Sequence, residues 1–182
     1  MQNNADSPSS RASLSPLDET TITVPDLHSI PVLYPHGTRI IWITQNGEIT
    51  VRDRQAIAAE LALGPPLVCH RRWSEARSGV EIDNCLDLME LFAFVRPARF
   101  CLPTPTGLAA QLSLPRPDSP EAMAALLPRA AFMLLDELAL LDGSALEEAA
   151  GIAKMMGDGG WMWGPLIGVH LGLDATRPAP PD

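Results

Sequence analysis

The most constraining stretch of this chain runs from Asp87 to Gln111, DLMELFAFVRPARFCLPTPTGLAAQ. It opens with apolar residues at helical spacing, so that one helix face requires a core: Leu88, Leu91, Phe92 and Val95. Pro97 and Pro103 interrupt this pattern, and Thr104-Pro105 restarts it as an N-cap followed by proline at the first helical position. The stretch therefore predicts two helices joined by an arginine-containing elbow.

Charge is distributed unevenly along the 182 residues, whose formal net charge is −9. Residues 1–36 have net charge −3, residues 37–115 balance eight arginines with eight acids, and residues 116–182 have net charge −6. A chain with a net negative charge is, taken as a whole, a poor ligand for the phosphate backbone of a nucleic acid. Any contact with nucleic acid is therefore expected to be local, through the central arginines.

The two ends of the chain differ in composition from its middle. Residues 1–38 are rich in Asn, Ser, Pro and Thr, which predicts a disordered leader, and residues 174–182 predict a Pro-rich linker. We expect one domain over residues 39–173. The longest apolar run, Ala122–Leu141, contains charged residues and is not expected to span a membrane. Three cysteines with no secretory signal favour reduced thiols and a cytoplasmic location.

The region before the central stretch predicts a small sheet. Arg39–Ile43 is a β-branched run, and Asn46-Gly47 suggests a tight hairpin turn into residues 48–51. Asp53 is expected to cap a helix that ends at about Leu63, and Leu67–Cys69 is bounded like a short buried strand.

Helices dominate the rest of the chain. The central helix is expected from about Asp83 to Val95, and the next from Pro105 to about Leu112. A third starts at Ser119-Pro120 and reaches about residue 141, with Pro128 as a kink or break. Residues 144–147 form a capping box that opens a fourth, residues 157–160 predict a flexible joint, and residues 161–173 are expected to fold back on the body. Strands followed by helices predict an α/β or α+β class with a small sheet and a helix-rich C-terminal half.

The sequence lacks the motif residues that most enzyme classes require. The single lysine, Lys154, has no glycine-rich loop before it and no hydroxyl after it, so a P-loop ATPase is excluded. The chain contains no G-x-S-x-G, no H-E-x-x-H and no paired C-x-x-C. Cys69 and His70 are neighbours in a predicted strand and would point to opposite faces, which is poor geometry for a nucleophile and its base.

One constellation resembles the middle of a proofreading-type 3′–5′ exonuclease domain. Leu67–His70 followed by Asp87–Leu91 is similar to the V-A-H-N strand and the D-T-L-E-L helix of that family. The resemblance implies an RNase H-like fold, and in the family two metal ions are held by four carboxylates.

The metal positions of that family are poorly matched. Residues 40–44, taken as the opening strand, have no D-x-E; Arg71 replaces an asparagine, and Glu75 stands where an aspartate would be. Asp136 could serve as the last acid, but Ala131 occupies the place of its histidine. A degenerate, inactive site is expected.

A closer resemblance covers about residues 66–173. Leu86–Ala109 and the later Trp161–Ile167, WMWGPLI, are similar to the N-terminal region of bacterial DinG-like, XPD-related ATP-dependent DNA helicases. The resemblance implies an eroded exonuclease domain that serves a helicase motor in cis or in trans. It also implies that ATP, magnesium and an iron–sulfur cluster belong to the motor, so that this chain has no cofactor of its own.

The expected function is therefore a non-catalytic accessory domain that positions the motor or contacts single-stranded DNA weakly. The candidate contacts with nucleic acid or a partner are Arg71, Arg72, Arg96, Arg99, Trp161 and Trp163. The competing interpretations are arginines paired with local acids and tryptophans that anchor the core. No catalytic, cofactor-binding or metal-binding residue is assigned. Two alternatives stay open: an active metal-dependent exonuclease that uses Glu75, Asp87, Glu90 and Asp136, and a stand-alone protein-interaction module.

Overall fold

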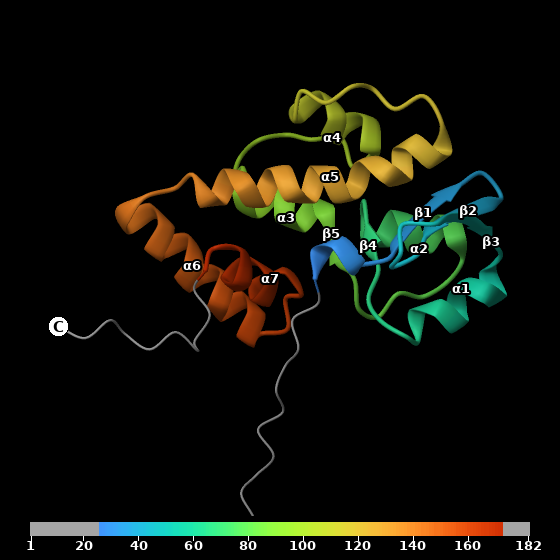
Figure 1. Ribbon diagram of the computed structural model, residues 1–182, viewed down its shortest axis with the longest axis horizontal. Helices are drawn as coiled ribbons and strands as arrows, with labels where there is room; N and C mark the ends of the chain where they lie inside the picture. The colour runs from blue at the N-terminus through green and yellow to red at the C-terminus, as the bar shows by residue number, and fades with distance from the viewer. Residues whose placement is uncertain (1–25, 173–182) are drawn as a thin grey trace, which may run out of the picture.

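A five-stranded mixed sheet forms the centre of the molecule (Figure 1). The structure, a computed structural model, describes residues 26–172. The strands lie in the order β3-β2-β1-β4-β5, with β2 antiparallel to β1 and β3, and β4 and β5 parallel to β1. Their bounds are β1 Val32–His36, β2 Arg39–Ile43, β3 Ile49–Arg52, β4 Leu67–Val68 and β5 Leu86–Asp87. The mixed α/β class predicted from the sequence is thus confirmed.

Seven α-helices and one 3-10 turn accompany the sheet in the described residues. They are η1 Leu27–Ser29, α1 Arg54–Leu61, α2 Arg71–Ser78, α3 Leu88–Val95, α4 Pro105–Gln111, α5 Pro120–Ala139, α6 Gly143–Asp158 and α7 Trp163–His170. The predicted hairpin turn is present, with Gly47 in the left-handed region at φ +81°. Asp53, Thr104 and Ser119 each accept a backbone N–H with their side chain as N-caps, as their positions in the sequence indicate.

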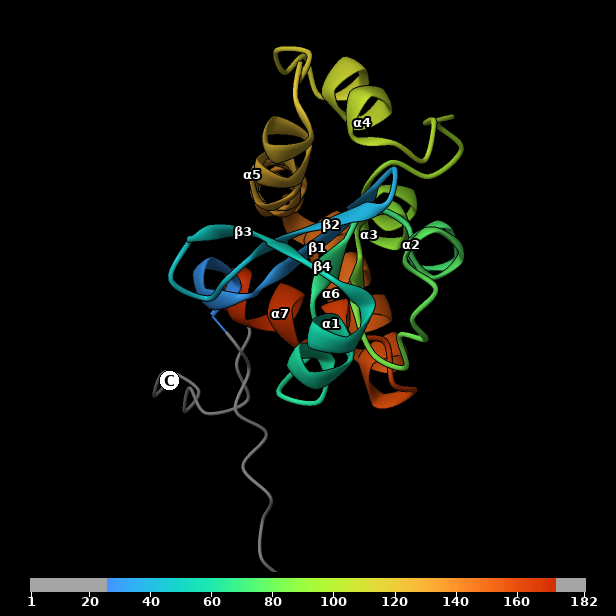
Figure 2. The ribbon, with the colours of Figure 1, turned by 90° about the vertical axis from the view of Figure 1, so that its right-hand side faces the viewer.

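The sheet separates two hydrophobic cores (Figure 2). One face packs against helices α3, α4, α5 and α7 and contains Val32, Ile41 and Leu67. The opposite face has a much smaller core, in which Leu33, Trp42 and Val68 meet Ile57 of α1 and the segment of residues 80–85. Alternating residues of β1 therefore point into different cores, as expected for a central strand covered on both faces.

The predicted disordered leader, residues 1–38, is wrong at its end. Strand β1 lies inside it and is the central strand of the sheet. Pro35 makes this strand hard to recognise in the sequence, because proline cannot donate a backbone hydrogen bond to a neighbouring strand. It is tolerated because β4 pairs only with Val32 and Leu33, so the Pro35 end of β1 has no neighbour on that side. Residues 1–25 and the predicted linker, residues 174–182, lie outside the described residues.

Four further boundaries differ from the prediction. The central helix begins at Leu88, because Asp87 belongs to β5 and caps the helix. Helix α5 continues through Pro128, so the predicted break is wrong. Helix α6 begins at Gly143 with Asp142 as its N-cap, rather than at a capping box formed by Ser144. The predicted flexible joint starts inside α6, where Gly157 packs against Gly164 of α7.

Candidate functional site

The carboxyl ends of β4 and β5 bring His70 and Asp87 to the same edge of the sheet. The two strands are parallel, with Val68 opposite Asp87 in the register. His70 ends the β4 segment and caps α2, because its Nδ1 accepts the N–H of Trp73 at 3.2 Å. The histidine therefore has a structural role as a helix cap.

Asp87 is the most connected polar residue of this edge. It is 5% exposed, and its Oδ2 accepts the N–H of Arg71 at 2.8 Å while its Oδ1 accepts the N–H of Met89 at 2.9 Å. Its carbonyl oxygen accepts the indole N–H of Trp163 at 2.8 Å. One aspartate thus caps α2 and α3 together and ties them to α7.

A groove of about 570 Å³ opens beside Asp87, between α2 and α3. Its polar lining consists of His70, Arg71, Arg72, Glu75, Asp87 and Glu90. Three basic and three acidic groups therefore share one surface. The groove brings together two of the predicted contact residues, Arg71 and Arg72.

Some of the charged side chains in the groove form ion pairs with one another. Arg71 Nε donates to Glu75 Oε1 at 3.2 Å, and Glu75 also accepts the N–H of Ile82 at 3.1 Å. The Ile82 hydrogen bond, followed by the bond from Arg71, lowers the pKa of Glu75. Arg72 is exposed and forms no ion pair with any residue between 26 and 172. Arg72 is therefore the groove cation that is available to a ligand.

Glu90 links this groove to the predicted aromatic contact Trp161. The indole N–H of Trp161 donates to Glu90 Oε2 at 2.9 Å, and its ring lies 5.1 Å from that of Phe94. Desolvation, and then the charge of Asp87, raises the pKa of Glu90, while the bond from Trp161 opposes this shift. Trp161 is half-buried and contacts α3, so only part of its ring is accessible.

Two of the predicted contact residues are structural. Trp163 is 0% exposed, which corrects its assignment as a surface contact and confirms the core-anchoring interpretation. Arg96 donates from Nε and Nη2 to Glu137 and from Nη1 to the carbonyl of Gln111, at distances down to 2.7 Å. Its guanidinium ties the elbow to α4 and α5, so Arg96 is paired with an acid, but with the distant Glu137 of α5 and not with the local acid that the sequence interpretation expected.

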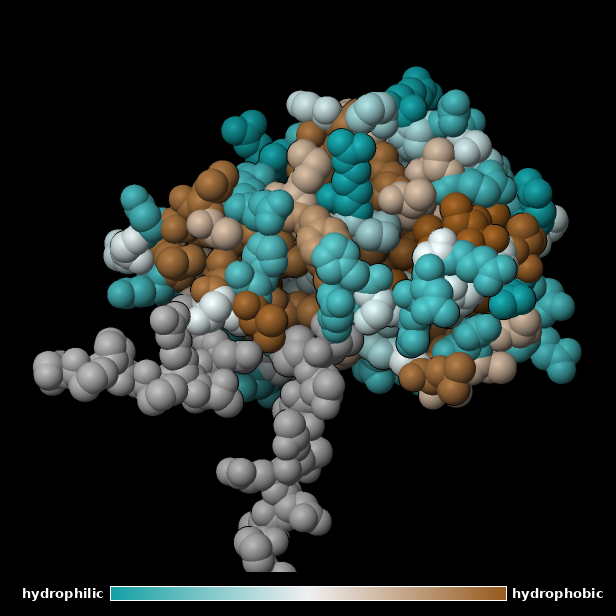
Figure 3. Space-filling model, viewed as in Figure 1, coloured by the Kyte–Doolittle hydropathy of each residue, from teal (hydrophilic) through white to brown (hydrophobic). Residues whose placement is uncertain are grey.

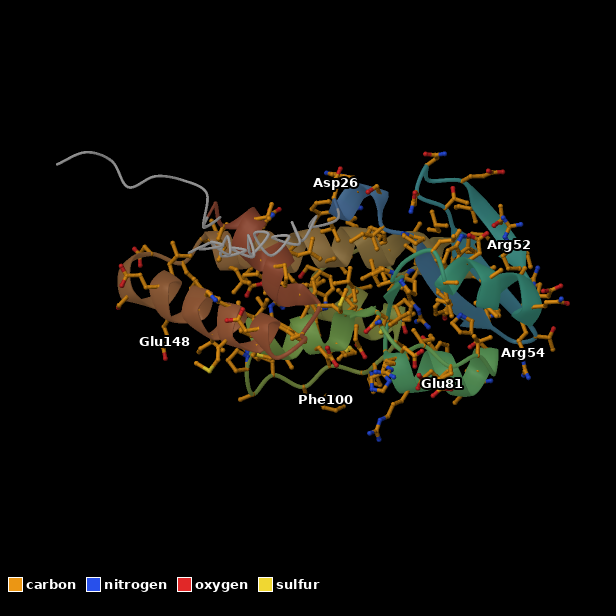
Figure 4. All side chains as sticks on the ribbon, turned by 90° about the horizontal axis from the view of Figure 1, so that it is seen from below. Asp26, Arg52, Arg54, Glu81, Phe100 and Glu148 are labelled. Carbon is orange, nitrogen blue, oxygen red and sulfur yellow. The ribbon has the colours of Figure 1, made fainter. Side chains whose placement is uncertain are left out.

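The elbow between α3 and α4 presents the remaining candidate, Arg99. This arginine is exposed and is followed by Phe100, which is 77% exposed and points away from the body (Figure 4). Ala98, which precedes Arg99, has φ +63°, a left-handed conformation that non-glycine residues adopt at some energetic cost. An exposed cation beside an exposed aromatic ring is a combination suited to a nucleotide base and its phosphate.

Of the four carboxylates considered for a metal, Glu75, Asp87 and Glu90 line the groove and Asp136 lies outside it. Asp136 Oδ1 lies 3.2 Å from His170 Nε2 on α7, while Glu75 is bonded to Arg71 and Ile82. Within residues 26–172, no three acidic, histidine or cysteine side chains gather as a metal would require. The opening strand of the sheet is β1 rather than residues 40–44, and β1 also has no acid.

Sequence reasoning missed α2 and, with it, the double cap formed by Asp87. The segment RRWSEARS buries only Ser74 and Ser78, so it has no apolar periodicity to detect. The available signals were His70 three residues before Trp73 and Gly79 at the helix end, where φ is +67°.

The thiols are free and buried in the described residues, as the sequence predicted for small apolar side chains. Among the described helices, none combines the length and hydropathy that crossing a bilayer requires. No family model, no curated protein and no solved structure matches this chain.

Proposed function

We propose that this chain is a non-catalytic, nuclease-derived domain of RNase H-like fold that serves a DinG-like ATP-dependent DNA helicase. The observation that carries the proposal is the sheet. Its order β3-β2-β1-β4-β5, with β2 alone running against the others, supports the RNase H-like fold that the exonuclease resemblance implies. The central strand ends in Tyr34, Pro35 and His36, where the exonuclease resemblance would require carboxylates.

The remaining acid positions support an inactive site. In-line attack on a phosphodiester by two metal ions needs several carboxylates converging on both ions. Here Glu75 is engaged by Arg71, and Asp136 pairs with His170 on α7. The frame of a nuclease without its metal ligands is suited to positioning a motor, which would supply ATP, magnesium and an iron–sulfur cluster. The proposal places the chain in the cytoplasm, in keeping with its unpaired thiols.

In this proposal the domain contacts single-stranded DNA weakly, through exposed arginines. Arg72 in the groove and Arg99 beside Phe100 are the two candidates that ion pairs do not occupy in the described residues. Arginine pairs with phosphate, and an exposed aromatic ring stacks on bases without regard to sequence. The acidic charge of the whole chain keeps such binding weak and dependent on salt.

The first prediction concerns these two arginines. We expect R72Q/R99Q to weaken binding of a fluorescent oligo(dT), measured by anisotropy across a salt series. The slope of log affinity against log salt should fall in magnitude by about 1.4, because each single-strand phosphate contact contributes about 0.7. R129Q is the control, since Arg129 is exposed on α5 and belongs neither to the groove lining nor to the elbow. An equal loss in R129Q would point to general attraction and contradict the proposed contact.

The exonuclease alternative is tested with the same oligonucleotide in magnesium or manganese. We expect no cleavage above a control without protein, whereas cleavage that scales with protein and stops with a chelator would establish the active enzyme. Co-purification with the full chain separates the remaining alternative. Recovery of a helicase body supports the accessory role, and recovery of an unrelated protein supports a stand-alone interaction module. The exposed apolar side of α6 specifically favours that second function.

A further inference from the structure

Helix α6 has apolar side chains on two opposite sides. One side packs on α7, where Ala153 is buried and Gly157 approaches Gly164. The other side exposes Ile152 by 42% and Met155 by 71%, whereas Met156, 39% exposed, follows Ala153 by three residues and borders the packed side. Apolar surface is visible over this end of the molecule in Figure 3. Because one side of α6 is already packed, the exposed apolar stripe on the other side is expected to bind a partner.

Acidic side chains border the exposed stripe. Glu148, Ile152 and Met155 follow one another at the i, i+4 and i+7 positions of one helix face. Glu148 points outward (Figure 4), and neither Asp142, Glu147 nor Glu148 forms an ion pair with the described part of the chain. The one cation of α6, Lys154, is held by Asp158 at 2.7 Å. The surface is therefore apolar at Ile152 and Met155 and negative toward the N-terminal end of α6.

We propose that this surface, called the α6 face and formed by Glu147, Glu148, Ile152 and Met155, binds a basic amphipathic helix of another protein. A partner helix would place its apolar anchors on Ile152 and Met155 and its lysines or arginines against the glutamates. The methionine side chain is flexible and can pack against apolar anchors of different shapes, which suits a surface that has no groove.

The alternative occupants are disfavoured by charge. Residues 1–25 contain Arg11 against three acids, and residues 173–182 contain Arg177 against two, so both end segments of this chain are themselves acidic. In a two-fold dimer built on α6, each copy would bring its own Glu147 and Glu148 to the interface, and the one cation of the helix, Lys154, is already held by Asp158. Like charges across an interface are unfavourable, so charge complementarity selects a basic partner.

This inference goes beyond the proposed function and can fail independently of it. The α6 face lies on a different helix from the groove of α2 and α3 and from the elbow carrying Arg99. DNA binding and helix binding therefore have separate variants and separate readouts.

The test uses two labelled synthetic peptides of about 18 residues, or five helical turns. They share one leucine-rich face and differ only in lysine or glutamate on the polar face. We expect the full-length chain to bind the lysine peptide in an anisotropy titration and to leave the glutamate peptide free. Binding should weaken as salt rises, because the charges lie at the exposed rim. Equal binding of both peptides would overturn the proposal.

Variants locate the binding on α6. I152Q/M155Q should weaken the lysine peptide by about tenfold or more, and E147Q/E148Q should weaken it less and flatten its salt dependence. L63Q is the matched control, because Leu63 is 79% exposed and follows α1, a helix that lies at the opposite end of the molecule from α6 (Figure 1). Circular dichroism confirms that each variant is folded. An affinity unchanged by both α6 variants would refute the assigned surface. A dimer in sedimentation that M155Q dissociates would instead assign the face to a second copy and overturn the basic partner.

Discussion

Asp87 connects three helices through its hydrogen bonds. Its carboxylate accepts the N–H groups of Arg71 and Met89, and its carbonyl accepts the indole of Trp163. These bonds connect the start of α2, the start of α3 and the buried part of α7. Because a buried donor without an acceptor is costly, the residue should dominate the stability of this edge.

The second prediction follows at this residue. D87A should lower the free energy of unfolding by about 2 kcal/mol, because the N–H of Arg71 loses its acceptor while that of Met89 keeps the Cys69 carbonyl at 3.2 Å. D87N should fall between D87A and the parent, since one amide oxygen can replace only one carboxylate oxygen. Urea unfolding followed by circular dichroism measures both.

The control is D53A, which removes an exposed N-cap that accepts the N–H of Ala56 at 2.8 Å. Its expected loss is about 1 kcal/mol, typical of a single cap. A D87A loss no larger than that of D53A would contradict the double-cap interpretation.

At the scale of elements, the pair α6 and α7 depends on two glycines in close approach. A Cβ on Gly164 would lie 2.5 Å from the Gly157 Cα and 2.6 Å from the Ala153 carbonyl oxygen. Backbone atoms cannot move aside as a flexible side chain can, so the two helices would have to separate. The joint predicted as flexible is in fact where these two helices meet most closely.

The third prediction is therefore that G164A destabilises the protein by about 1–3 kcal/mol in thermal or urea unfolding. Gly168 provides the control in the same helix, because a Cβ there meets nothing within 4 Å. G168A should be neutral or stabilising by up to about 1 kcal/mol, as alanine favours a helix over glycine. Equal losses in the two variants would show that helix propensity rather than close packing decides.

Elements with local signals were predictable from the sequence, whereas those defined by tertiary packing were not. The hairpin at Asn46-Gly47 and the caps at Asp53, Thr104 and Ser119 each depend on a few adjacent residues. Helix α5 passes Pro128 because Leu126, Leu127, Ala130 and Ala131 are all buried around it. The burial of these side chains outweighs the backbone hydrogen bond that Pro128 cannot form. Because this burial depends on the tertiary fold, a local sequence pattern does not reveal it.

The candidate site was predictable only in part for the same reason. Arg71 and Arg72 follow a strand that the sequence indicated, so their place at a sheet edge could be expected. The pairing of Arg96 with Glu137 joins residues 41 positions apart, and the bond from Trp163 to Asp87 spans 76. Neither separation leaves a periodic signal. Their structural roles therefore required the fold.

At the scale of the whole molecule, the sheet divides a large core from a small one, and a cysteine lies in each. Cys69 belongs to the large core and Cys85 to the small core. Burial, and then the charge of Asp87, raises the pKa of both thiols, that of Cys85 to about 12. A protonated buried thiol is unreactive, so labelling reports the opening of its own core.

The fourth prediction is that Cys85 reacts with a thiol reagent at pH 8 faster than Cys69 in the folded protein. The smaller core has fewer buried apolar contacts and should open at a lower free energy. C69A/C101A and C85A/C101A, each with one thiol left, give the two rates separately. Identical rates that track global unfolding would contradict independent opening, and equal rates in denaturant provide the control.

Helix α5 contacts β1, β2, β4, α3, α4, α6 and α7, although every strand of the sheet precedes it in the chain. During synthesis every strand of the sheet, the last of which ends at Asp87, is translated before Pro120 is added. The larger apolar face of the sheet then stays uncovered until α5 emerges, so the nascent chain passes through a stage in which that face is open to chaperones.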